Sequence, residues 1–127
     1  MFFLMPYPIR DNSLHVDIEV FGVSVDLKRK VSGLIDTGFS GYLSLPFVIA
    51  FPLGLILKGQ QPYTLADGSV SNHFVCLGTV EFGGQSVVVP IDVQPSGPIL
   101  IGNQLLKKLS LSLSVDFMRD SFELQKR

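Results

Sequence analysis

The feature that most constrains the fold is a pattern that occurs twice along the chain: a β-hairpin, a short apolar strand and a short helix. In the first copy, apolar and polar residues alternate over residues 14–31 with a break near Gly22, which predicts a hairpin. The apolar run at residues 33–35 predicts a short buried strand after it. Ser44 as an N-cap and Pro46 in the first turn then predict a short helix.

The second copy of the pattern lies near the C-terminal end of the chain. An apolar strand is expected at residues 99–101, followed by Gly102 and a helix. Lys107 and Lys108 lie near the end of that helix, where cations suit the helix dipole. The first helix is expected to end at residues 52–54, which contain a proline and a glycine. A pseudo-two-fold β-barrel would produce such a repeat.

Three further turns separate extended segments. Asp-Gly at residues 67–68 and Gly-Gly at residues 83–84 each connect two strand-like runs, and residues 119–120 mark a turn near the C-terminus. The chain is therefore expected to be all-β, a closed barrel with one or two short helices. At 127 residues it is expected to form a single domain, residues 1–127, with an N-terminal arm at residues 1–13.

The composition argues against a nucleic-acid partner and favours self-association. The formal net charge is -1 with 17% charged residues, and the basic stretches at residues 28–30 and 126–127 are too short for a phosphate-binding patch. The hydrophobic content of 46% is high for a small domain. It fits strands covered on both faces, or surface that is hidden in an oligomer.

The N-terminal segment and the cysteine content bear on location. The opening run MFFLMPYPIR is apolar, but Pro6 and Pro8 interrupt it, and it lacks the basic start and cleavage site of a secretory signal. No continuous apolar run reaches the roughly 18 residues of a membrane-spanning helix. The single Cys76 cannot form an internal disulfide, in keeping with a reducing compartment. The sequence predicts a cytoplasmic protein with no membrane partner.

Asp36 draws attention because it follows an apolar strand, where an ionised carboxylate needs partners or a chemical role. Metal and histidine-based alternatives find little support. His15 and His73 share no spacing with other potential ligands, so neither a zinc site nor a Ser-His-Asp site is expected. His73 and Cys76 should point to opposite faces of a strand, which argues against a Cys-His nucleophile pair. No metal and no cofactor are expected.

Two segments of the chain resemble the retropepsin family of aspartic proteases. LIDTG at residues 34–38 matches the active-site signature, and ILIGNQLL at residues 99–106 resembles the apolar-apolar-Gly-x-x-Leu-Leu segment that retropepsins carry near their C-terminus. Together with a hairpin between them, they extend the resemblance over about residues 16–117. The resemblance implies a closed retropepsin-like (acid protease) β-barrel and an aspartic endopeptidase.

The resemblance also implies roles for the three residues of the signature. Asp36 would be one half of a carboxyl pair that shares a proton, with the ionised carboxylate as base and its protonated partner as acid. Thr37 would hydrogen-bond to neighbouring backbone and hold the loop. Gly38 would allow the substrate backbone to approach where a Cβ would obstruct it.

A carboxyl pair needs a second aspartate, and the chain has a single Asp-Thr-Gly. Asp67 lies in a turn-like Ala-Asp-Gly-Ser, while Asp92 and Asp116 lie in strands without the threonine and glycine. The simplest solution is a homodimer whose two-fold axis brings two Asp36 side chains together. Single-motif retropepsins are built in this way.

In the family a mobile β-hairpin, the flap, closes over an extended peptide. Residues 64–72 match that hairpin, and its small polar tip suits a mobile lid whose backbone can pair with substrate. The tip residues expected to bind substrate are Ala66, Asp67, Gly68 and Ser69. An ordinary surface hairpin without a function is the alternative.

The chain departs from the family pattern at two linked places. Many retropepsins carry Ala-Asp after the signature and Gly-Arg in the later motif, and that Asp and Arg form an ion pair. Phe39, Ser40, Gly102 and Asn103 occupy these positions here. A neutral hydrogen bond between Ser40 and Asn103 could replace the ion pair at a lower desolvation cost. Phe39 cannot supply a hydroxyl to the aspartate and has no role in that scheme.

Two principal functions compete. The first is a homodimeric aspartic endopeptidase acting on an extended peptide or protein substrate. The second is a catalytically silent retropepsin-like module that dimerises or holds a peptide in the same groove. A β-barrel fragment of a larger assembly is a third possibility. The intact signature at residues 36–38 favours the first, since a pure binding module has no physical need for a buried carboxylate pair.

Overall fold

The computed structural model describes residues 6–127. Within this range the elements are β1 (Tyr7–Pro8), β2 (His15–Phe21), η1 (Val25–Leu27), β3 (Arg29–Ile35), β4 (Leu43–Pro46), α1 (Phe47–Ala50), η2 (Phe51–Leu53), β5 (Ile56–Thr64), β6 (Val70–Phe82), β7 (Gln85–Gln94), β8 (Leu100–Ile101), α2 (Asn103–Lys108), β9 (Leu111–Asp116) and β10 (Ser121–Lys126).

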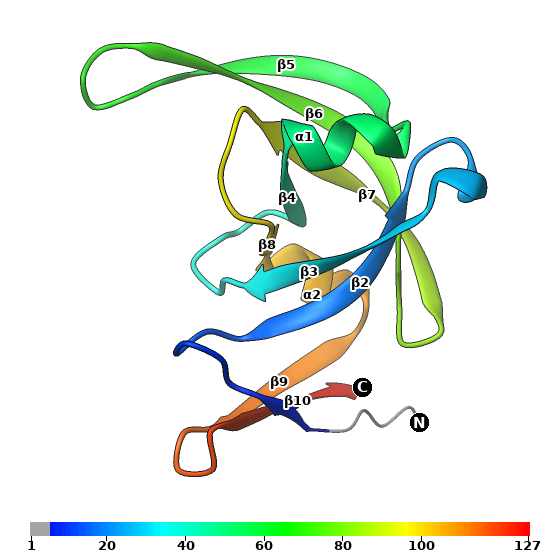
Figure 1. Ribbon diagram of the computed structural model, residues 1–127, viewed down its shortest axis with the longest axis vertical. Coiled ribbons are helices and arrows are strands. Elements are labelled where there is room, and N and C mark those ends of the chain that lie inside the picture. Colours follow the sequence, from blue (N-terminus) through cyan, green and yellow to red (C-terminus); the bar gives the residue numbers. More distant parts are fainter. Residues whose placement is uncertain (1–5) are drawn as a thin grey trace.

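Six strands close into a barrel (Figure 1). Their hydrogen-bonded order is β2-β3-β8-β4-β7-β6, and a pairing between β2 and β6 closes the ring. β3 and β8 run parallel, as do β4 and β7, whereas the hairpin partners are antiparallel. The expectation of an all-β closed barrel with one or two short helices is confirmed.

Alternation along the strands determines which side chains form the core. Val16, Ile18 and Val20 of β2 are buried, while Asp17 and Glu19 between them are exposed, as the period of two predicts. The largest fully buried side chains are Phe122, Leu43, Leu45, Leu53, Ile91, Ile101, Leu105, Leu109 and Leu124. Leu105 and Leu109 come from α2 and the residue after it, so this helix covers one end of the barrel core.

The predicted hairpins are present with the expected turns. The alternating segment at residues 14–31 forms most of the β2–β3 pair, and residues 67–68 lie in the turn between β5 and β6. Gly83 and Gly84 connect β6 to β7 with positive φ angles of 58° and 80°. A two-residue hairpin turn that matches the strand twist needs this backbone conformation at both positions, which glycine adopts without strain.

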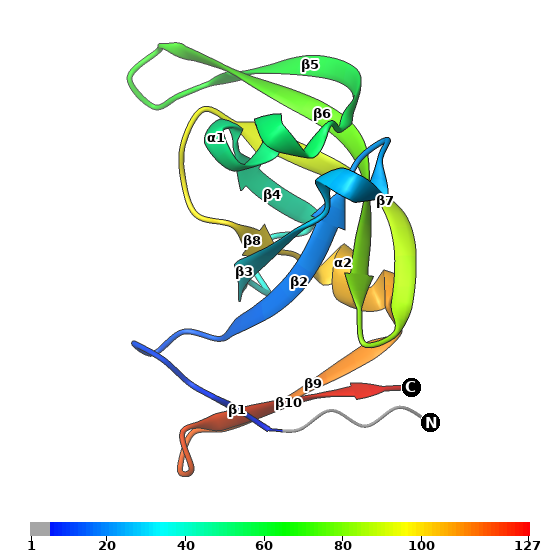
Figure 2. The same ribbon diagram turned by 45° about the vertical axis from the view of Figure 1, so that its right-hand side comes forward.

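A second, smaller sheet lies beside the barrel (Figure 2). β10 pairs with β9 on one edge and with β1 on the other, and the rings of Tyr7 and Phe122 stack with centroids 5.0 Å apart. β1 belongs to the N-terminal arm expected at residues 1–13. Residues 1–5 of that arm lie outside the described residues.

Both helices begin or end where the sequence indicated, with one correction at Ser44. Gly54 ends the α1–η2 segment in the left-handed conformation, with φ 66°, and α2 follows Gly102 directly. Ser44, however, is not an N-cap. It lies in β4, is 5% exposed, and accepts a hydrogen bond from Gln94 Nε2 at 2.9 Å, while Pro46 occupies the N-cap position.

A second correction concerns residues 33–35, which were expected to form a separate strand. They are the C-terminal half of β3, which continues from the hairpin without a break. Pairing with both β2 and β8 explains the continuity, because the strand end is hydrogen-bonded on two sides.

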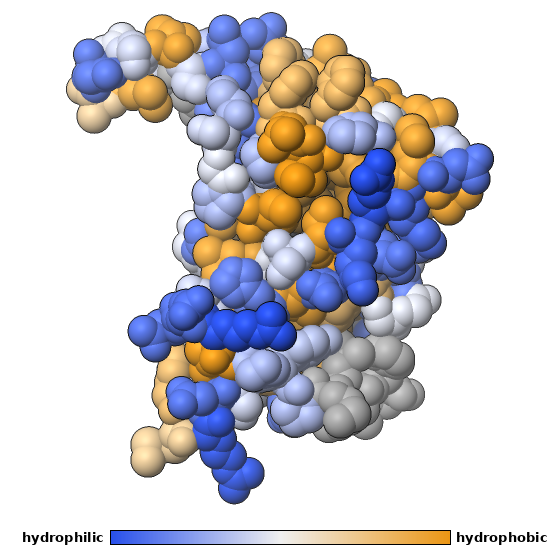
Figure 3. All heavy atoms as spheres, viewed as in Figure 1, coloured by the Kyte–Doolittle hydropathy of each residue, from blue (hydrophilic) through white to orange (hydrophobic). Residues whose placement is uncertain are grey.

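Much of the hydrophobic content lies on the surface. Figure 3 shows apolar side chains gathered over the end of the molecule that carries α1 and the β2–β3 connection. Val23, Val48 and Phe51 in this region are 73–77% exposed. In the part of the chain that the structure describes, no helix combines the length and the apolar character needed to cross a membrane.

Candidate active site

Asp36 is the first residue after β3, at the point where two parallel strands end. Ile35 lies opposite Ile101 of β8, and the Asp36 backbone N–H donates to the Ile101 carbonyl at 3.0 Å. The Leu14 carbonyl accepts a hydrogen bond from Ile35 N–H at 2.7 Å on the other side of the strand. The backbone that carries the carboxylate is therefore held between two neighbours.

The carboxylate of Asp36 is hydrogen-bonded within the loop of residues 36–42, called the Asp36 loop below, which connects β3 to β4. The Gly38 backbone N–H donates to Asp36 Oδ1 at 2.9 Å, and the Phe39 N–H donates to the Asp36 carbonyl at 3.0 Å. A Cβ on Gly38 would lie only 3.2 Å from Oδ1, so glycine allows this close approach. The Asp36 side chain is partly buried, while Thr37 and Gly38 are exposed. The arrangement presents an oriented carboxyl group at the edge of the barrel.

Asn103 joins the Asp36 loop to the start of α2. Its side-chain Nδ2 donates to the Thr37 carbonyl at 2.7 Å, and its backbone N–H donates to the Phe39 carbonyl at 3.0 Å. The residue thus connects the two loops, but its partner is the Thr37 carbonyl where the sequence suggested the exposed Ser40 hydroxyl. Thr37 contributes to this connection through its backbone.

Phe39 has a packing role that the sequence did not reveal. Its ring lies against the backbone of two glycines: a Cβ on Gly41 would be 2.6 Å from the ring, and one on Gly102 would be 2.8 Å from it. A Cβ on Gly102 would also overlap the Gly41 carbonyl oxygen. The ring therefore covers a contact in which two backbones meet directly. In the sequence, the glycines at positions 41 and 102 are the feature that could have indicated this close packing.

The β5–β6 hairpin extends beyond the barrel on the side where β3 ends (Figures 1 and 2). Its turn is closed by hydrogen bonds from Leu65 N–H to the Ser69 carbonyl and from Gly68 N–H to the Leu65 carbonyl, at 2.8 and 2.9 Å. Gly68 has a φ of 86°, and a Cβ at this position would meet open space, with no atom within 4 Å. Ala66 and the rest of the tip are exposed.

Asp67 acts within this turn. Its Oδ1 accepts hydrogen bonds from the Ser69 hydroxyl at 2.6 Å and from the Ser69 N–H at 2.9 Å. These bonds, the hydroxyl contribution first, lower the pKa of the Asp67 carboxyl. The carboxylate stabilises the hairpin tip, which fits the turn role inferred from the sequence.

Asp92 of β7 lies beside the Asp36 loop. Its Oδ2 is 3.4 Å from the position that a Cβ of Gly41 would take. Burial raises the pKa of the Asp92 carboxyl, and the positive field of His73 opposes that shift. In the sequence analysis, Asp92 was a candidate only for the second member of the carboxyl pair.

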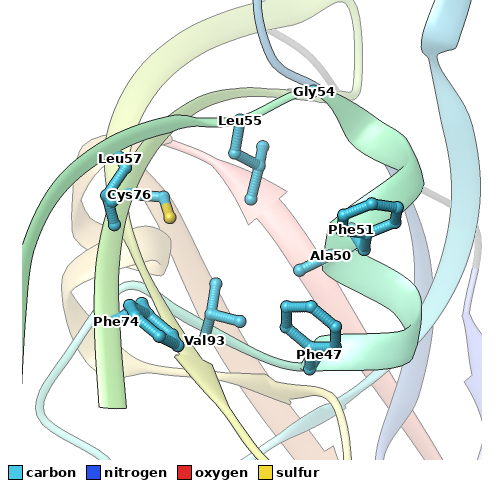
Figure 4. A pocket seen from close by; sticks show the side chains of 9 residues that line it. All are labelled: Phe47, Ala50, Phe51, Gly54, Leu55, Leu57, Phe74, Cys76 and Val93. Atoms are coloured by element: carbon cyan, nitrogen blue, oxygen red, sulfur yellow. The ribbon is translucent and has the colours of Figure 1, made fainter. Parts of the chain in front are cut away.

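An apolar pocket of about 370 Å³ lies behind the hairpin base (Figure 4). Its walls are Phe47, Ala50, Phe51, Gly54, Leu55, Leu57, Phe74, Cys76 and Val93. None of these belongs to the Asp36 loop. The pocket lies between the α1–η2 segment and the base of the β5–β6 hairpin, and the Asp36 carboxyl does not line it.

His73 and Cys76 lie on opposite faces of β6, as predicted from the sequence. Cys76 pairs with Ile91 and is buried, whereas His73 pairs with Gln61 and lies on the other face of β6. Burial raises the pKa of the Cys76 thiol, which disfavours the reactive thiolate. Among residues 6–127, no three His, Cys, Asp or Glu side chains group closely enough to hold a metal ion.

Comparisons with known proteins support the fold of this chain and do not extend to its activity. No protein-family model matches the chain, and no curated protein matches it. Among solved structures, it is similar to the EIAV protease complexed with the inhibitor HBY-793, with a TM-score of 0.61 over 83% of this chain and 95% of that chain. The two sequences are 14% identical over this match. At this identity the similarity establishes a retropepsin-like fold.

The contact between Gly41 and Gly102 predicts the effect of adding one methyl group. We expect Gly102→Ala to lower the free energy of unfolding by about 1–3 kcal/mol, because a Cβ there meets backbone that cannot rotate away. Gly59→Ala, at an open position of β5, is the matched control, with an expected change within about 0.5 kcal/mol. Urea unfolding at fixed protein concentration measures both. Equal effects would mean that the backbones are not in contact.

Proposed function

We propose that the protein is a homodimeric aspartic endopeptidase in which water is activated between two Asp36 carboxyls. The observation that carries the proposal is the fixed Asp36 carboxyl, held by Gly38 N–H at the end of β3 in a retropepsin-like barrel. The solved structure that the chain resembles is a protease in complex with an inhibitor. That neighbour supports the assignment by analogy of fold alone.

The chemistry requires two carboxyl groups with different protonation. The ionised one accepts a proton from water as the oxygen attacks the peptide carbonyl, and the protonated one donates its proton to the carbonyl oxygen. The carboxyl that accepted the proton from water then donates it to the amine nitrogen as the C–N bond breaks, and the other carboxylate takes a proton back from a hydroxyl group of the tetrahedral intermediate. Two adjacent carboxyls sharing one proton supply both functions, because like charges so close cannot both ionise.

A second Asp36 is the best source of the partner carboxyl. Asp67 is engaged with Ser69 in the hairpin turn, and Asp116 Oδ1 accepts hydrogen bonds from the N–H groups of Met118 and Arg119. A two-fold axis at the Asp36 loop would pair identical side chains. The exposed Thr37 side chain would then lie at the junction of the two subunits.

The β5–β6 hairpin is proposed as the flap, with Ala66, Asp67, Gly68 and Ser69 at the tip over the bound peptide. Its exposed strands can pair with an extended substrate, whose backbone would supply the hydrogen bonds. A cytoplasmic location is part of the proposal and is supported by the single Cys76, which is buried and without an internal disulfide partner.

The first prediction from this function concerns Asp36. We expect Asp36→Asn to abolish peptide cleavage and to leave the fold intact, because the amide is nearly isosteric but cannot act as a base. The wild-type protein should also gain thermal stability with pepstatin at mildly acidic pH, and the variant should lose that gain. Digestion of an unbiased peptide library, followed by mass spectrometry, measures the activity.

Asp26→Asn is the matched control for that experiment, since it removes one exposed carboxylate from the β2–β3 connection. It should retain activity and pepstatin stabilisation. Cleavage by purified Asp36→Asn would overturn the assignment. Absence of cleavage and of pepstatin binding in the wild type would favour the silent module.

The second prediction concerns concentration. Because each site would be shared by two chains, specific activity should fall as the protein is diluted below the dimer dissociation constant. Sedimentation and initial rates are to be measured over the same dilution series. Constant specific activity in samples that sediment as monomers would rule out a shared site.

The third prediction tests the flap by comparing two hairpin tips. Gly68 and Gly84 both have positive φ, at 86° and 80°, and both are open to solvent, so valine imposes similar backbone strain at each. We expect Gly68→Val to reduce kcat/KM at least tenfold and Gly84→Val to leave it within about twofold, with similar small losses of thermal midpoint. Similar turnover in both variants would remove the flap from the mechanism.

A further inference from the structure

The sheet formed by β4, β7 and β6 has a second face opposite the core. Ile91 and Val93 of β7 are buried in the core, so Asp92 between them points the other way. The strand register places Ser44 of β4 and Val75 of β6 directly beside Asp92 on that face. Asp92 is therefore a carboxylate in the middle of a sheet face.

Two elements of the proposed peptidase site border this face. On one side, the Asp36 loop brings Gly41 next to the Asp92 carboxylate, with 3.4 Å between Oδ2 and the Cβ position of the glycine. On the other side, His73 lies two residues from Val75 in β6 and pairs with Gln61 of β5, within the strands that lead to the flap. Asp92 lies between the catalytic loop and the flap strands.

Among the described residues, no lysine or arginine forms an ion pair with Asp92. The carboxylate is partly buried, and the pKa of Asp92 is raised by that burial, with His73 as the group whose charge opposes the shift. Within residues 6–127, the lysine and arginine ion pairs are Lys28–Glu81 and Arg119–Asp116, and neither includes Asp92. The neighbouring polar side chains, Gln94 and Ser44, hydrogen-bond to each other.

We propose that Asp92 determines substrate specificity by binding a cationic side chain, lysine or arginine, of the peptide held between the flap and the Asp36 loop. The inference rests on the proposed peptidase function and adds the substrate class. Ionised Asp92 in a partly desolvated position gains a charge-assisted hydrogen bond when such a side chain enters. At Gly41 a Cβ would lie 2.6 Å from the Phe39 ring and 3.4 Å from Oδ2, so the Asp36 loop meets the Asp92 carboxylate at this position with backbone and without a side chain.

The dimer extends this preference to both ends of the substrate. A two-fold axis through the paired Asp36 residues creates two Asp92 sites, one from each protomer. They lie at equivalent distances on either side of the bond to be cleaved. Cleavage sites in a peptide library should therefore be enriched in lysine or arginine at two positions related by this symmetry.

The test compares matched peptides once the library has defined a cleaved sequence. Each pair differs in one residue, lysine against norleucine, at the enriched position. The wild-type protein should cleave the lysine peptide with a kcat/KM at least tenfold higher than that for the norleucine peptide. Asp92→Asn should abolish this preference and should cleave the norleucine peptide at about the wild-type rate. Asp92→Lys should reverse the selection and favour glutamate. A structural role for Asp92 would lower all rates together. Asp26→Asn is the control and should keep the preference.

A binding experiment separates this inference from the peptidase assignment. Because Asp36→Asn is expected not to cleave, its affinity for two extended peptide pools that differ only in lysine against norleucine at one fixed position, measured by fluorescence anisotropy, reports recognition alone and needs no cleaved sequence to be known. If no peptide is cleaved by wild type but the lysine pool binds more tightly in an Asp92-dependent way, the peptidase function fails and the specificity role stands. Cleavage or binding without preference for lysine or arginine overturns the specificity role.

Discussion

The direct contact between the backbones at Gly41 and Gly102 is the constraint on which the site depends. The Gly41 carbonyl occupies the space in which a side chain of Gly102 would begin, so two segments far apart in the sequence meet without side chains between them. Gln104 N–H then donates to the Gly41 carbonyl at 3.1 Å. Because Asp36 N–H donates to the carbonyl of Ile101, the neighbour of Gly102, the same contact fixes the point at which the Asp36 loop begins.

Two uncharged side chains stabilise the contact between the backbones of Gly41 and Gly102. Asn103 donates to the Thr37 carbonyl at 2.7 Å, and the Phe39 ring covers the glycines. An ion pair at this place would have to be desolvated beside the Asp36 carboxyl, the proposed catalytic group. A neutral amide and an aromatic ring provide registration without adding a charge.

Sequence reasoning succeeded where local pattern decides structure, as in the hairpins and in the helix that follows Gly102. It was wrong at Ser44, because β4 is defined by pairing with β7 and β8, which lie about fifty residues away in the chain. The partner of Asn103 and the packing of Phe39 were missed for the same reason, since each depends on a contact between distant loops. Asp92 shows the limit of sequence reasoning most clearly. The sequence identifies it as an aspartate in a strand, but only the tertiary structure places its carboxylate beside Gly41.

The β5–β6 hairpin combines a loosely supported end with a defined point of bending. The described side chains of β5 are exposed, so the outer half of the strand has few core contacts and a low local stability is expected. The register between the strands shifts between Leu57 and Gly59, a bulge that interrupts the ladder close to the barrel. The apolar pocket behind Leu57 and Phe74 leaves room on the inner side of that bulge. Bending at this point would move the tip while the barrel and the Asp36 loop stay fixed, which is the mechanical requirement for a lid over a preorganised carboxyl group.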